Sequence, residues 1–288
     1  DTLFVENCDF ENNTAGDDAG SFMTFDKPAY FVGCNFSNSY AGDDAGVFMN
    51  FHYLYLSECT FTNDSCGNEA GVAMAFDNLY IEKCSFMGNK SINSAGAISN
   101  FDSLFVRTST FESNRAGNTG GAIINYEICL IVNSTFSGNY SGTRGGGICN
   151  YGFLGISFST IAFNSADSAG AGIQLYDNIT MKNCLVSDNN APKHQDIFTE
   201  FGSILSGGGN LIGILDNGTI NPVNSDIIGS PAEPVDAGLL ALDFNGGSTK
   251  THALSENSPA IDAAAADTQS IDQRGCPRPY GNSSDIGA

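Results

Sequence analysis

Two copies of the hexapeptide AGDDAG, 26 residues apart, hold the side chains that could most readily do chemistry in this chain. The first copy contains Asp17 and Asp18, the second contains Asp43 and Asp44, and Glu69 follows in a looser third copy. Carboxylate oxygens are the ligands that Ca²⁺ prefers, and grouped acidic residues act as acid and base in glycoside hydrolysis. Three interpretations stay open for these five residues: solvated turn carboxylates, which we favour, a Ca²⁺ site, and catalysis.

Catalysis is the weakest of the three interpretations because no basic partner accompanies the carboxylates. A lyase would need an Arg or Lys base beside its cation, yet no Arg or His stands near this part of the sequence pattern. The three histidines, His52, His194 and His252, are scattered, and no P-loop, G-x-S-x-G or C-x-x-C motif occurs. We therefore expect no enzyme activity, no catalytic residue and no cofactor except Ca²⁺, with a polysaccharide lyase or hydrolase as the alternative.

The carboxylates belong to a repeat of about 25 residues that covers most of the chain. The repeats can be aligned on one large apolar residue, which is Phe10, Phe36, Phe61, Phe86, Phe111, Phe136, Ile161 or Val186 in successive repeats. Two residues earlier stand Cys8, Cys34, Cys59, Cys84, Ser109, Ser134, Ser159 and Cys184. Three residues later stand Asn13, Ser39, Asp64, Asn89, Asn114, Asn139, Asn164 and Asn189. A constant residue type at each phase of a fixed period indicates a solenoid whose coils stack in register.

Each repeat alternates as short strands do, for example in Leu104-Phe105-Val106 and Ser109-Thr110-Phe111, which are separated by a two-residue break. A helical repeat would need ten or more residues at a period of about 3.6, and the spacing leaves no room for one. The sequence predicts an all-β fold, a right-handed parallel β-helix of about eight to nine coils over residues 1–213. Residues 214–288 are irregular, and we expect them to form a C-terminal cap or tail over the open end.

Each row of the repeat has an expected physical role. The Phe row should stack as an aromatic core, and the Cys/Ser row should point inward at a bend that admits only compact side chains. Of the other cysteines, Cys66, in a turn, and Cys276, in the tail, are the ones we expect to be exposed. The Asn row should lie at turns, with each amide bonded to the Asn of the next coil. A Gly row should allow tight turns that a Cβ would block. A hydroxyl row, Thr60, Ser85, Thr110, Thr135 and Thr160, should point outward, so the change Thr110→Ala should be nearly neutral.

A second outward row is apolar, and it is the strongest indication of a binding surface. Period-two alternation places Phe4, Tyr30, Tyr55, Tyr80, Phe105 and Leu130 one above another on the outside of the coils. Monomers seldom leave such a stripe in water. It could be covered by the C-terminal tail, by another subunit or surface partner, or by stacked sugars. Because Leu3 enters the first coil at once and leaves an open β edge, we expect self-association, with glycans as a further class of partner.

Composition narrows the setting of the protein. The formal net charge of −21, from 32 acidic and 11 basic groups, makes nucleic acid a poor partner. No run of 18 apolar residues occurs, so we expect no membrane span. Nine N-x-S/T sequons fit a secreted glycoprotein, at Asn12, Asn35, Asn63, Asn89, Asn133, Asn139, Asn178, Asn217 and Asn282.

Two motifs carry a family resemblance. The pair F-x-x-N and G-G-A-I, at Phe111–Asn114 and Gly120–Ile123, resembles the repeat of polymorphic outer membrane proteins, which are surface β-helices. The tail resembles the C-terminal part of microbial choice-of-anchor surface proteins, although Ser248 stands where those proteins carry a proline. The matching segments are Asn245-Gly246-Gly247, Thr251-His252-Ala253-Leu254, Ser258-Pro259-Ala260-Ile261-Asp262, Asp272-Gln273-Arg274-Gly275 and Asp285-Ile286-Gly287-Ala288. The resemblance implies surface display. We therefore expect a non-enzymatic, extracellular, cell-surface structural or adhesive protein, with self-assembly into a fibre or sheath as one form of that role.

Overall fold

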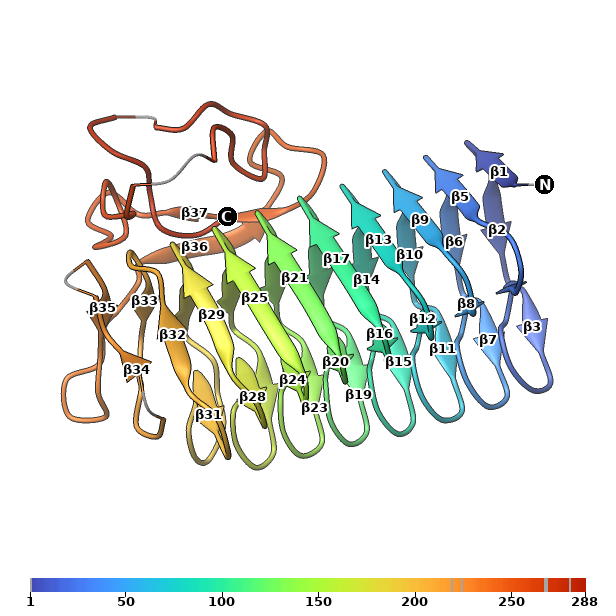
Figure 1. The fold of residues 1–288 in the computed structure, drawn as a ribbon, viewed down its shortest axis with the longest axis horizontal. Helices are drawn as coiled ribbons and strands as arrows, with labels where there is room; N and C mark the ends of the chain where they lie inside the picture. Colours follow the sequence, from blue (N-terminus) through green and yellow to red (C-terminus); the bar gives the residue numbers. More distant parts are fainter. Residues whose placement is uncertain (1, 219, 224, 267–268, 280) are drawn as a thin grey trace.

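The chain folds as a parallel β-solenoid of about eight coils, each about 25 residues long, which confirms the predicted fold class (Figure 1). The computed structural model describes residues 2–218, 220–223, 225–266, 269–279 and 281–288. Within these residues it contains strands and turns but no helix. Four parallel sheets, named A to D here, run along the rod, and each coil is numbered by the sheet A strand that opens it.

Sheets A and B are the longest, with ten strands each. Sheet A contains β1 (Leu3–Glu6), β5 (Ala29–Val32), β9 (Leu54–Ser57), β13 (Leu79–Glu82), β17 (Ser103–Arg107), β21 (Ile128–Val132), β25 (Phe153–Ser157), β29 (Ile179–Lys182), β32 (Ile204–Ser206) and β34 (Ile220–Asn221). Sheet B contains β2 (Asp9–Glu11), β6 (Asn35–Ser37), β10 (Thr60–Thr62), β14 (Ser85–Met87), β18 (Thr110–Glu112), β22 (Thr135–Ser137), β26 (Thr160–Ala162), β30 (Leu185–Ser187), β33 (Leu211–Ile212) and β35 (Ile227–Ile228).

Sheets C and D close the coils with shorter strands. Sheet C contains β3 (Thr14–Ala15), β7 (Tyr40–Ala41), β11 (Ser65–Cys66), β15 (Lys90–Ser91), β19 (Arg115–Ala116), β23 (Tyr140–Ser141) and β27 (Ser165–Ala166). Sheet D contains β4 (Phe22–Thr24), β8 (Phe48–Asn50), β12 (Ala73–Ala75), β16 (Ile98–Asn100), β20 (Ile123–Asn125), β24 (Ile148–Asn150), β28 (Ile173–Leu175) and β31 (Ile197–Thr199). An antiparallel pair, β36 (Leu239–Asp243) and β37 (Thr251–Leu254), belongs to the tail.

The interior of the solenoid is a stack of like side chains, as the repeat predicts. Phe86 is fully buried and stacks on Phe61 and Phe111 with ring centroids 4.7 Å and 4.5 Å away. Inward Leu and Ile side chains of sheets A and D fill the rest of one continuous apolar core. Because each coil lies in register with the next, burial of one ring depends on the rings above and below it.

The Asn row forms the predicted ladder of amides. The Asn114 side-chain amide donates to Asn139 Oδ1 at 2.9 Å and to the carbonyl of Phe86 at 3.0 Å, and its own Oδ1 accepts the backbone N–H of Asn89. Asn139 and Asn164 repeat this pattern one coil further on each time. The ladder therefore satisfies the backbone groups that the turn withdraws from the sheets.

The Gly row has a different physical reason from the one we expected. The left-handed residue of this turn is the one before it, for example Ala70 with φ of 68°. A Cβ on Gly71 would instead lie 2.1 Å from the carbonyl oxygen of Gly96 in the next coil. Close approach of neighbouring coils, not backbone conformation, therefore requires glycine at Gly71.

The cysteines of the inward row are buried as predicted, except in the first coil. Cys34, Cys59, Cys84 and Cys184 are buried free thiols, whereas Cys8 is exposed because no coil precedes it in the described residues. Cys66 was expected to be exposed, but it is buried because its strand β11 turns it inward beneath the neighbouring turn. Cys276 in the tail is exposed, as predicted.

The coils extend past residue 213, where we expected them to end. Strand β34 pairs with β32, and β35 pairs with β33, so sheets A and B continue to Ile228. The tail then turns back and lies along the side of the rod instead of over its open end (Figure 1). It packs on the outward face of sheet B, where Leu185 and Leu211 form an apolar cluster with Ala237, Ala260 and Ile286.

Candidate functional site

The acidic turns bring three of the five candidate carboxylates together. Ligand oxygens of Asp17, Asp18 and Asp43 all lie within 4.8 Å of one another at the surface of the first two coils. Asp44 is turned away: its Oδ1 accepts the N–H of Glu69 at 3.0 Å, and burial raises the pKa of its carboxyl. The cluster of Asp17, Asp18 and Asp43 is thus the part of the predicted calcium site whose donor set suits a hard cation.

Glu69 belongs to a separate polar group on the outside of sheet D. The Ser99 hydroxyl donates to Glu69 Oε1 at 2.5 Å. Burial raises the pKa of Glu69, and burial beside Glu69 raises the pKa of the Tyr126 phenol to about 12. The first basic residue at this phase of the repeat is Arg144, three coils beyond Glu69, and its guanidinium is paired with Glu200. Among the described residues, this phase of the repeat therefore supplies no basic side chain in the coils of the carboxylates.

The tail covers Thr110, Thr135 and Thr160 of the hydroxyl row, which corrects our expectation that the whole row is open to water. Thr60 and Ser85 of the same row stay partly exposed. Thr110 is 1% exposed, and its hydroxyl donates to the carbonyl of Lys250 at 2.6 Å. The buried amide of Gln273 donates to Thr110 Oγ1 and to Thr249 Oγ1, both at 2.9 Å, and its Oε1 accepts from the Thr135 hydroxyl. Gln273 thus joins two coils to the tail, and Thr110 is a contact residue.

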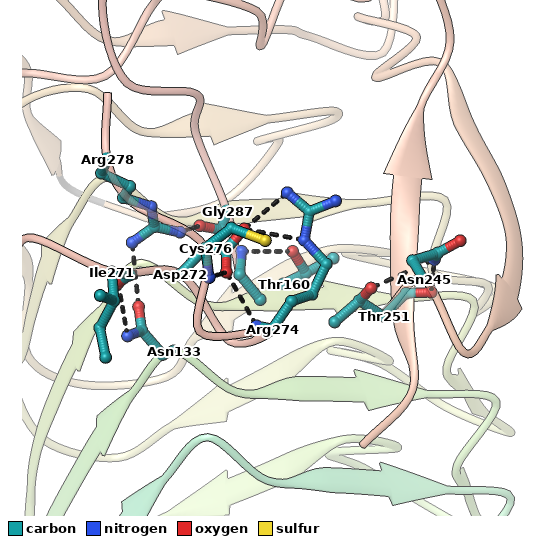
Figure 2. Close-up of polar contacts among 11 residues, drawn as sticks. Asn133, Thr160, Asn245, Thr251, Ile271, Asp272, Arg274, Cys276, Arg278 and Gly287 are labelled. Carbon is teal, nitrogen blue, oxygen red and sulfur yellow. Dashed lines mark hydrogen bonds and ion pairs between the residues drawn. The ribbon is translucent and has the colours of Figure 1, made fainter. Parts of the chain in front are cut away.

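Further polar contacts fasten the tail near its C-terminal end (Figure 2). The Arg278 guanidinium donates to Asn133 Oδ1 at 2.9 Å and to the carbonyl of Gly287 at 2.7 Å. Asn133 in turn donates to the carbonyl of Ile271, and Thr160 Oγ1 accepts the N–H of Ala288. Of these tail residues, Gly287 and Ala288 belong to the segments that carry the family resemblance, and the bonds together dock the tail on the solenoid.

A cleft of about 680 Å³ lies between the tail and sheet B, and its polar groups are already engaged. Asp262 accepts backbone N–H groups from Asn282 and Ser283, which lower the pKa of its carboxyl. His252 Nε2 lies 2.9 Å from the Ser137 hydroxyl, and burial lowers the pKa of the imidazole. His252 therefore joins the tail to sheet B.

The outward face of sheet A is a long apolar surface that the tail leaves open among the described residues. Strand pairing places all six predicted residues of the stripe in one row, from Phe4 on β1 to Leu130 on β21. The row continues through Gly155, Thr180 and Leu205. Phe4 and Leu205 are exposed and the others are partly exposed. Because the tail lies on sheet B, our proposal that it covers this stripe is wrong.

The rings of the stripe use much of their faces on one another. Tyr80 and Phe105 stack at 4.5 Å with an interplanar angle of 10°, and Phe4 stacks on Tyr30 at 4.7 Å. A second surface ladder behaves in the same way, for example Phe51 and Phe76 at 4.9 Å and 3°. Sugars bind aromatic side chains through the ring face, whereas these ladders present ring edges to solvent.

The structure also separates the nine sequons by accessibility. Asn12, Asn35, Asn63, Asn178 and Asn282 are exposed, and Asn217 is partly exposed. Asn89 and Asn139 are fully buried members of the amide ladder, and Asn133 is fully buried beneath the tail. A glycan cannot be accommodated on these three side chains in the folded chain, because each amide nitrogen donates hydrogen bonds in the interior.

Sequence reasoning missed several residues that shape the sheet A face. Tyr53, Ile128 and Phe153 stand two residues before the stripe in their coils and share its outward direction, and Ile128 and Phe153 are 42% and 43% exposed. The same period-two alternation that identified the stripe could have found them. Gly155 and Thr180 were also missed, because their importance lies in the small size of their side chains.

Comparison with known proteins adds no identity. No family model matches the chain, and no curated protein or solved structure is significantly similar to it. The described residues contain no helix long and apolar enough to cross a membrane.

Proposed function

We propose that the chain is a non-enzymatic, extracellular structural or adhesive protein that associates through the outward face of sheet A. The observation that carries the proposal is the apolar stripe from Phe4 to Leu205. It stays partly exposed along nine coils, while the tail packs on the neighbouring sheet. A surface of this length is costly to leave in water, and association with a partner removes that cost.

The acidic turns support a non-enzymatic role. Asp17, Asp18 and Asp43 form a compact group, but the basic residue that shares the phase of these turns, Arg144, lies several coils away and is paired. Hydrolysis or elimination in a polyuronate needs a proton donor or base beside the carboxylates. The edge-on presentation of the aromatic ladders also favours a protein partner over a stacked sugar.

An extracellular, surface location is part of the same proposal. It is supported by five exposed sequons, by the acidic surface and by the resemblance of the repeats and tail to microbial surface proteins. The free thiols do not oppose it, since seven of the nine cysteines are buried in the solenoid.

Sedimentation velocity tests the association. With reductant present to keep Cys8 and Cys276 as thiols, we expect the sedimentation coefficient to rise between roughly 1 and 200 µM, a range that brackets weak protein association. The variant Phe105→Lys on the stripe should associate about tenfold more weakly. Phe51→Lys, an equally aromatic position on the second ladder, is the matched control and should behave as the parent chain. A strictly monomeric parent chain over the whole range would contradict the proposal.

A turnover assay tests the absence of catalysis. Incubation with polygalacturonate or alginate, with and without Ca²⁺, should release neither reducing ends nor unsaturated products. Turnover that depends on Ca²⁺ and disappears in Asp43→Ala would instead establish the polysaccharide-active alternative.

A further inference from the structure

We infer that the partner of the sheet A face is a second copy of the same chain, packed face to face with its rod axis reversed. The two copies are related by a two-fold axis that runs along the strands, between β13 and β17. This inference rests on the proposed function, because it specifies how the associating face pairs. Its basis is the complementarity of three outward rows of sheet A under that symmetry.

The first row, the stripe, is a ridge in its first half and a hollow in its second half. Aromatic side chains occupy the stripe on the strands from β1 to β17, whereas Gly155 and Thr180 leave a depression of about 470 Å³ further along. With the axis between β13 and β17, Tyr30 of one copy lies opposite Gly155 of the other. Phe4 lies opposite Thr180 in the same way. The ridge of each copy therefore enters the hollow of its partner, and it does so twice.

The second row contains Glu82 and Arg107, and the charges of these two side chains determine where the two-fold axis lies. Glu82 on β13 and Arg107 on β17 are direct neighbours in register on this face. Among the described residues the Arg107 guanidinium makes no ion pair, and Glu82 accepts a hydrogen bond from the Tyr55 hydroxyl. An axis between these strands places Glu82 of each copy opposite Arg107 of the other. An axis through β17 would place Arg107 opposite its own copy, which is repulsive.

The third row matches polar with polar and apolar with apolar in the same register. The third row consists of the outward residues that stand two positions before the stripe residue in each coil. The symmetry places Asn78 opposite Ser103 at the centre and Tyr53 opposite Ile128 on either side. Phe153, whose side chain is 43% exposed, then lies opposite Pro28.

The expected dimer is weak. Under this symmetry eight strands of each copy overlap, from β1 to β29. At about 4.8 Å apart, with about four residues of roughly 3.3 Å on each, they form a face of roughly 500 Å² per copy. A dimer that buries roughly 1,000 Å² in total lies at the low end for specific interfaces, so we expect a Kd on the order of 10 µM. With a Kd in this range, much of the protein is monomeric in dilute solution, and the stripe of each monomer is then exposed to water.

A charge exchange tests the register. Glu82→Arg and Arg107→Glu each create two like-charge contacts per dimer and should raise the Kd about tenfold or more. The double variant should restore the Kd to within about threefold of the parent chain. Lys83→Glu is the control, because Lys83 is paired with Glu58 outside this face. Single variants that associate as well as the parent chain would overturn the register.

Cross-linking tests the orientation independently. In a Cys8→Ser, Cys276→Ser background, chains with Val32→Cys and chains with Ser157→Cys are mixed and treated with a bifunctional maleimide of about 10 Å reach, the spacing of packed sheets. We expect a cross-linked dimer in the mixture and little in either chain alone. Self-linking of the Val32→Cys chain would show parallel rods, which overturns this inference and leaves the proposed function intact. Absence of association in sedimentation would overturn both.

Discussion

Asp64 occupies a rung of the amide ladder between Ser39 and Asn89, where the five coils that follow carry asparagine. Its Oδ1 accepts the N–H of Ser39 at 2.8 Å, and its N–H donates to Asn89 Oδ1 at 2.9 Å. Its Oδ2, however, is buried without a hydrogen-bond partner. An amide there could donate to Asn89 Oδ1 and to the carbonyl of Phe36, in the way that Asn89, one rung further on, donates to Asn114 Oδ1 and to the carbonyl of Phe61. We predict that Asp64→Asn stabilises the protein, and that the gain depends on pH.

The magnitude follows from the cost of keeping a buried carboxylate ionised. Burial raises the pKa of Asp64 from 3.8 to about 7. Below pH 3.8 the carboxyl is protonated in both the folded and the unfolded chain, so the variant should gain only about 1 kcal/mol from its extra hydrogen bond. Between pH 3.8 and about 7 the unfolded chain loses its proton first, so the parent chain loses about 1.4 kcal/mol of stability per pH unit. Above pH 7 the advantage of Asp64→Asn should level off at about 5 kcal/mol, the sum of the hydrogen-bond and ionisation contributions.

Denaturant unfolding of both proteins at pH 4, 6 and 8 measures this difference. Asp26→Asn, which removes one exposed carboxylate, is the control for the loss of a negative charge. Asn114→Asp places a carboxylate in the middle of the ladder and should reverse the effect, with a loss of stability that is largest at pH 8. A stability difference between Asp64→Asn and the parent chain that stays the same from pH 4 to pH 8 would refute the reasoning, because Asp64 would then not ionise within the fold.

The remaining predictions concern the core and the tail. Phe86→Ala should cost about 3–5 kcal/mol in thermal or denaturant unfolding, because it opens a cavity in a fully buried ring stack. Phe76→Ala on the surface ladder, where the ring is 39% exposed, should cost only about 1–2 kcal/mol. Gln273→Ala should loosen the tail by about 2–3 kcal/mol, measured as faster proteolysis of residues 229–288 with intact coils. Because the pKa of His252 is lowered by burial, tail docking should weaken as pH falls below about 6.5 and should be insensitive to pH above it, which hydrogen exchange of the tail would show.

The repeat was sufficient to predict the coils because each coil contacts only its neighbours. Once the period is known, the neighbours of Phe86 or Asn114 are the residues one period before and after, and their stacking follows without long-range information. The C-terminal end of the coils was harder to predict from the sequence, because strands β34 and β35 are only two residues long and show little of the repeat pattern.

The docking position of the tail could not be predicted in the same way. Its contacts join residues more than a hundred positions apart, such as Gln273 with Thr110, and no period relates them. The hydroxyl row looked like an exposed surface because alternation indicates only that a side chain leaves the core, not what covers it. For the acidic turns, the repeat predicted the grouping of Asp17, Asp18 and Asp43, while the separate contacts of Glu69 depend on Ser99 of the next coil.

The tail supports only one part of the rod. Its contacts run from Thr110 in the fifth coil to Leu211 in the ninth, so the first four coils have only each other for support. Because the stability of a solenoid is roughly a sum of interfaces between neighbouring coils, the first four coils should unfold first when the rod is heated or bent. Asp64, whose ionisation weakens the amide ladder, lies in the third coil, among the coils that the tail does not contact. The two ends of the rod therefore differ mechanically: the end that carries the tail is the more rigid, and the other end loses stability as the pH rises toward about 7.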